Sequence, residues 1–110
     1  MINQEKQIFK STTAGDSQTF DFVAKDTGGS LFLQIDGDAT SVTGIFYGKI
    51  KAENEWQPIP AFCHNDNSFK TTFDKKGLYT IPIIGMSFFK AEVATLNDEV
   101  TIIGRVILDV

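Results

Sequence analysis

Apolar residues recur at every second position along much of this chain, and this alternation restricts the fold more than any other feature. Side chains of a β-strand point alternately to its two faces, so the spacing indicates strands with one buried and one exposed face. Residues 31–35 carry leucine or isoleucine at each odd position, and residues 42–50 carry an apolar residue or glycine at each even one. No stretch shows the 3.6-residue period of a helix. The chain is therefore predicted to be all-β.

Turn residues divide the chain into about eight short strands at a spacing of roughly ten residues. Gly28-Gly29 precede one strand, the Asp-Gly-Asp of residues 36–38 follows it, and Gly85 turns the chain later. Many short strands with even spacing are typical of antiparallel folds, not of parallel strands joined by helices. The sequence predicts an antiparallel two-layer β-sandwich, with the jelly roll as one form of it.

Several segments carry more specific expectations. Residues 7–9 are predicted to form a short first strand, and residues 56–60, with two prolines, an edge strand, because proline donates no ladder hydrogen bond. Residues 63–68 are expected to be an exposed loop. Residues 87–93 and 100–108 alternate most clearly and are predicted to pair as a hairpin.

Length and composition indicate one domain covering residues 1–110. Of the residues, 42% are hydrophobic and ten are phenylalanine, enough for a core without disulfides; Cys63 is the only cysteine. The net charge of −4 and the scattered lysines argue against a nucleic-acid partner. The start of the chain lacks the pattern of a secretory signal, and no apolar run is long enough to span a bilayer. We expect no membrane partner.

Catalytic and metal chemistry find little support in the sequence. Cys63 and His64 are the only thiol and imidazole, but neighbours in an extended chain point to opposite sides, so they are not expected to form a nucleophile and base pair. With Asp66 they offer three zinc ligand types but no second cluster. Asp36 and Asp38 supply too few oxygens for a calcium loop. Nucleotide-binding glycine motifs are absent, so no cofactor is expected.

Aromatic residues are the best candidates for binding. Tyr47, Trp56 and Tyr79 are the aromatic residues most expected at the surface, where they could stack on sugar rings or anchor a protein partner. Packing in the core or at a sheet edge is the simpler interpretation for each of the three.

A series of motifs between residues 41 and 107 resembles a known module. A glycine-bearing strand, a tryptophan on the returning strand, a Gly-x-Tyr strand start and a closing Gly-Arg strand follow one another. They are Val42-Thr43-Gly44-Ile45-Phe46-Tyr47-Gly48-Lys49-Ile50, Trp56-Gln57-Pro58-Ile59, Gly77-Leu78-Tyr79-Thr80-Ile81, Gly85 with Phe89-Lys90-Ala91, and Val100-Thr101-Ile102-Ile103-Gly104-Arg105. This order is similar to a β-sandwich module of virion structural proteins of tailed bacteriophages.

The resemblance implies a non-enzymatic head-decoration, neck or tail protein, assembled in the host cytoplasm and resident in the virion. Its partners would be other virion proteins or further copies of itself. The residues expected to make these contacts are Tyr47, Trp56, Phe62 and Phe88. The alternative function is a carbohydrate-binding module, in which the same aromatic side chains bind a glycan.

Overall fold

The computed structural model describes residues 2–22, 28–83 and 85–108, and within these residues it contains twelve strands and no helix. The strands in chain order are β1 (Ile2–Ser11), β2 (Gly15–Asp16), β3 (Phe20–Asp21), β4 (Gly29–Asp36), β5 (Val42–Lys49), β6 (Gln57–Pro58), β7 (Ala61–Cys63), β8 (Ser68–Lys70), β9 (Thr72–Phe73), β10 (Gly77–Pro82), β11 (Phe88–Leu96) and β12 (Val100–Leu108).

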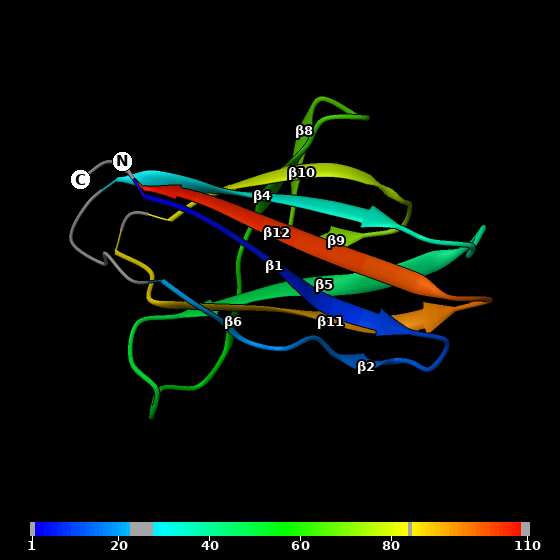
Figure 1. The fold of residues 1–110 in the computed structure, drawn as a ribbon, viewed down its shortest axis with the longest axis horizontal. Helices are drawn as coiled ribbons and strands as arrows, with labels where there is room; N and C mark the ends of the chain where they lie inside the picture. The colour runs from blue at the N-terminus through cyan, green and yellow to red at the C-terminus, as the bar shows by residue number, and fades with distance from the viewer. Residues whose placement is uncertain (1, 23–27, 84, 109–110) are drawn as a thin grey trace.

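These strands form two sheets that pack face to face (Figure 1). The first sheet has six strands in the order β1-β12-β4-β10-β7-β8. In the second sheet β11 and β5 lie side by side at the centre, β2 and β3 pair with β11, and β6 and β9 pair with β5. Neighbouring strands are antiparallel. The prediction of an all-β antiparallel sandwich is confirmed.

The structure has more strands than the predicted eight for two reasons. The outer partners of β11 and of β5 are each divided into two short strands, and the β7–β8 hairpin is additional. β2 and β3 pair with successive parts of β11, and β6 and β9 with successive parts of β5. Between β6 and β9 the chain leaves the second sheet, and β7 and β8 extend the first sheet beside β10. The remaining connections alternate between the two sheets, as in a jelly roll.

The predicted hairpin of residues 87–93 with 100–108 is wrong. β11 pairs with β5 in the second sheet, whereas β12 pairs with β1 and β4 in the first. The connection between them crosses the sandwich, and the Asn97 side chain fixes it by accepting hydrogen bonds from the backbone N–H groups of Thr40 and Ser41 at 3.0 and 3.1 Å. Alternation determines which face of a strand is buried but not which strand lies beside it.

The core lies between the sheets and is built from the alternating positions that the sequence indicates. Its centre is aromatic: the ring centroid of Phe46 lies 5.0 Å from that of Phe73, 5.3 Å from Tyr79 and 6.2 Å from Phe89. Tyr79, one of the three aromatic residues considered for the surface, is a core residue, as the simpler interpretation had it, because β10 turns it inward with Ile81. Other buried side chains on alternating positions are Leu31, Leu33, Ile35, Val42, Ala91, Val93, Val100, Ile102 and Val106.

The first strand is longer than the predicted segment 7–9 and covers Ile2–Ser11. Apolar alternation does not reveal this strand, because many of its residues are polar. The strand lies at the edge of the first sheet, where side chains such as Glu5 and Lys6 face water. A bulge between Gln7 and Phe9 lets both Ile8 and Phe9 enter the core.

Candidate functional site

Three of the four residues predicted to make contacts come together on the outer face of the second sheet. Pairing of β11 with β5 sets Phe88 opposite Lys49 and Lys90 opposite Tyr47. Trp56 directly precedes β6, whose Pro58 pairs with Tyr47 on the other side of β5. We call this group, Tyr47, Lys49, Trp56, Phe88 and Lys90, the tryptophan cluster.

Two lysine ammonium groups hold the tryptophan cluster together. Lys49 Nζ lies 4.3 Å from the centroid of the Trp56 ring and 5.8 Å from that of Phe88. Lys90 Nζ lies 5.1 Å from the Trp56 centroid and 5.5 Å from that of Tyr47. Cations within about 6 Å of an aromatic face are attracted by the ring quadrupole. The aromatic residues are therefore neither core residues nor a bare aromatic surface.

Further polar contacts fix the two lysines. Lys90 Nζ donates to Asp16 Oδ2 at 2.8 Å, and only 15% of the Lys90 side chain is exposed. Lys49 Nζ donates to the backbone oxygen of Ala52 at 2.9 Å, within the loop that leads to Trp56. This loop is closed by Asn54, whose side chain accepts a hydrogen bond from Lys51 N and whose own N–H donates to Lys51 O. These contacts hold both lysines beside the aromatic rings of the cluster.

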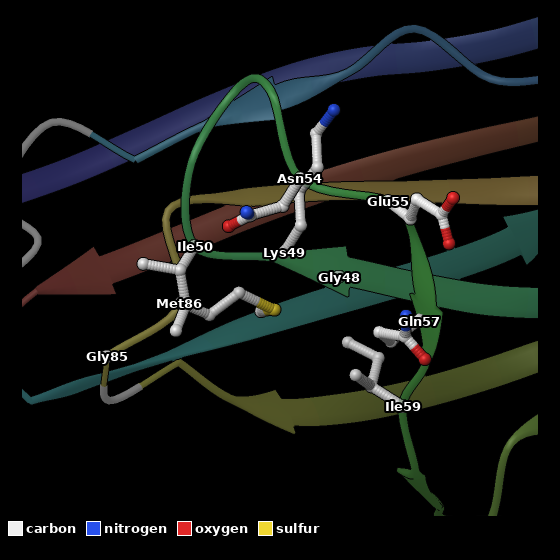
Figure 2. Close-up of a pocket in the computed structure, with 9 residues that line it drawn as sticks. All are labelled: Gly48, Lys49, Ile50, Asn54, Glu55, Gln57, Ile59, Gly85 and Met86. Carbon is white, nitrogen blue, oxygen red and sulfur yellow. The ribbon is translucent and has the colours of Figure 1, made fainter.

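A pocket of about 670 Å³ opens beside the tryptophan cluster (Figure 2). Its apolar lining includes Ile50, Ile59 and Met86, and Gly48 makes room for Met86, because a β-carbon at residue 48 would collide with the Met86 sulfur. Alternation had placed Ile50 on the same strand face as Phe46, but β5 ends at Lys49, and 63% of Ile50 is exposed whereas Phe46 is buried.

The fourth predicted residue, Phe62, lies on the first sheet and not in the tryptophan cluster. Its ring contacts Phe69 at a centroid distance of 5.2 Å with an angle of 65° between the ring planes, and the His64 ring at 4.9 Å with an angle of 89°. Exposed Phe69, Leu78 and Ile103 share this outer face, and the sequence analysis did not select them. The sequence signal for Leu78 and Ile103 was alternation, because their neighbours Tyr79 and Ile102 are buried.

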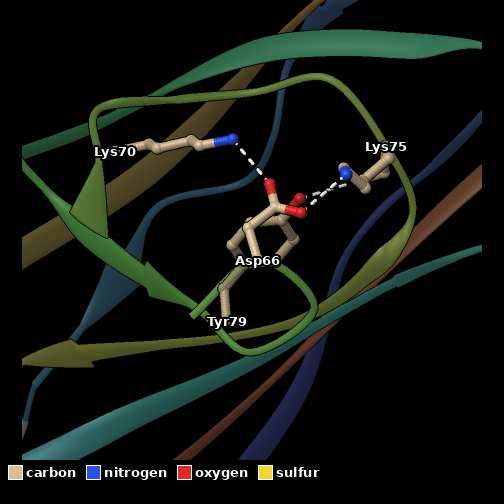
Figure 3. Close-up of polar contacts among 4 residues, drawn as sticks. All are labelled: Asp66, Lys70, Lys75 and Tyr79. Atoms are coloured by element: carbon tan, nitrogen blue, oxygen red, sulfur yellow. Dashed lines mark hydrogen bonds and ion pairs between the residues drawn. The ribbon is translucent and has the colours of Figure 1, made fainter. Parts of the chain in front are cut away.

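The prediction of an exposed loop at residues 63–68 holds for its centre, where residues 64–67 form the turn of a β-hairpin, but not for its two ends. Cys63 is buried in β7 and Ser68 begins β8, so only residues 64–67 form the turn. Asp66 in this turn accepts hydrogen bonds from Lys70 Nζ at 2.6 Å and Lys75 Nζ at 2.7 Å (Figure 3).

The Asp66 contacts join the hairpin to the next loop. The hydrogen bond from Lys70, and then that from Lys75, lowers the pKa of Asp66 from 3.8 to about 2 and raises the pKa of both lysines. The Tyr79 hydroxyl donates to the backbone oxygen of Lys75 at 2.8 Å, and burial raises the pKa of this phenol. These residues anchor the hairpin to the loop that leads into β10.

Cys63 and His64 do not form a nucleophile and base pair. The thiol is buried, whereas His64 is exposed and its Nε2 lies 2.6 Å from Thr80 Oγ1. Within residues 2–22, 28–83 and 85–108, no group of three or more His, Cys, Asp or Glu side chains could hold a metal ion, Cys63, His64 and Asp66 included. Those same residues form no helix long and apolar enough to cross a membrane.

Two solved structures share this fold over nearly the whole of this chain. The SPBc2 prophage-derived protein YomS superimposes with a TM-score of 0.85 and 18% identity over 98% of this chain and 94% of its own. The PBSX exported protein XepA superimposes with a TM-score of 0.79 and 15% identity over 96% of this chain. This chain spans only 38% of XepA. No protein-family model and no curated protein sequence matches the chain.

Proposed function

We propose that this chain is a non-enzymatic structural or assembly protein of a tailed-bacteriophage particle and that it works through protein–protein contacts. The observation that carries the proposal is the fold shared with a prophage-derived protein over nearly the full length of both chains. Because one fold can serve many functions, the surface must support the role as well.

The outer surface of the sandwich supports a binding role. Phe69, Leu78 and Ile103 expose large apolar side chains on the first sheet, and the tryptophan cluster lies on the second. Contiguous apolar surface is characteristic of protein contacts, and aromatic residues with a polar rim are enriched in such contacts. The proposed partners are other virion proteins or further copies of this chain.

A head-decoration, neck or tail component is the kind of particle protein that we propose. Each of these works by repeated contacts in a symmetric assembly, so a small rigid domain with two outer faces suits all three. In this proposal the chain assembles in the host cytoplasm and remains in the virion.

A carbohydrate-binding role has less support. A sugar ring stacks on an open aromatic face, but the Lys49 and Lys90 ammonium groups lie 4.3 and 5.1 Å from the centre of the Trp56 ring. A bound sugar would have to compete with these lysines, which are themselves held by Ala52 and Asp16. The geometry therefore favours protein partners over glycans.

The proposal is tested by asking whether the chain travels with phage particles. Particles released from the strain that encodes it are purified on a density gradient, and each fraction is analysed by mass spectrometry. We expect peptides of this chain to follow the capsid proteins at a constant ratio across the particle band. Recovery of the chain only as free protein, in the cells or in the medium, would refute the proposal.

A further inference from the structure

We draw no further inference here: the strongest candidate, the pocket between the end of β5, the loop before β6 and Met86, is lined by both Lys49 and Glu55, so charge favours no occupant and nothing in the structure shows what covers it.

Discussion

Lys90 holds its ammonium group 5.1 Å from the centre of the Trp56 ring, and this contact joins β11 to the loop before β6 across β5. The same group is ion-paired with Asp16 next to β11. Through this lysine, segments from three parts of the chain are fixed on the outer face of the second sheet. The tryptophan cluster is thereby a structural feature as well as a candidate contact surface.

Replacing Lys90 should weaken the fold. Lys90→Met keeps the apolar stem but removes the ion pair and the cation–π contacts, and a partly desolvated contact of this kind contributes about 1–2 kcal/mol. We expect the free energy of unfolding, measured by urea denaturation, to fall by about that amount. Lys51→Met, on the exposed hairpin loop, should leave it unchanged. Equal effects of the two substitutions would show that the ion pair and the cation–π contacts of Lys90 add nothing to the free energy of unfolding.

The aromatic centre of the core should be far more sensitive to truncation than the surface. Phe46→Ala leaves a cavity among the rings of Phe73, Tyr79 and Phe89, which typically costs about 3–5 kcal/mol of the free energy of unfolding. Phe69→Ala removes the same atoms from an exposed position and should cost less than about 1 kcal/mol. Chemical denaturation of both variants measures the difference, and a smaller loss at Phe46 than at Phe69 would contradict the fold.

Gly44 should not tolerate even a methyl group. A β-carbon at this position would collide with the Phe73 ring and with the backbone oxygen of Glu92. Gly44→Ala is expected to lower the free energy of unfolding by about 1–3 kcal/mol or more, as overpacking of a tight core does. Thermal unfolding followed by circular dichroism checks this, with Ser41→Ala at an exposed position as the control. An unchanged melting temperature would mean that β5 and β9 do not approach this closely.

Asp66 should make stability depend on pH in the acid range. Its folded-state pKa of about 2 lies below the ordinary 3.8, so the folded protein favours the ionised carboxylate. The resulting stabilisation is complete above about pH 4 and is lost as the pH falls toward 2.

The matched comparison is wild type against Asp66→Asn. At pH 7 the variant should be the less stable of the two in urea, and the gap should close as the pH falls through this window. Groups common to both proteins cancel in the difference. A gap that stays constant from pH 7 to pH 2 would rule out the lysine contacts as its cause.

The fold class follows from the sequence because strand alternation reports burial directly. Phe46, Ile81 and Val93 are inward in the structure as their spacing predicts. Strand pairing does not follow in the same way, since β11 and β12 carry the same pattern and lie in different sheets. The sequence also does not show which strand lies at a sheet edge. The predicted length of the polar edge strand β1 was therefore too short.

The candidate contact residues could be named from the sequence and the resemblance that it carries, but their grouping required the structure. Tyr47, Trp56 and Phe88 share a cluster only because β5 lies between β11 and β6. Phe62 lies on the other sheet because the chain crosses over between β6 and β7, which no local pattern indicates. The exposed side chains of Leu78 and Ile103 belong to one surface only because their strands, β10 and β12, pair with the two edges of β4.

The central claim is that this chain is a repeated component of a phage particle, and immunogold electron microscopy tests it most directly. Antibodies raised against the purified chain are applied to released particles, with particles from a strain deleted for the gene as the control. The account predicts gold at the same position on successive wild-type particles and none on the deletion particles. Gold that is absent from intact wild-type particles, while the free chain is still detected beside them, would contradict it.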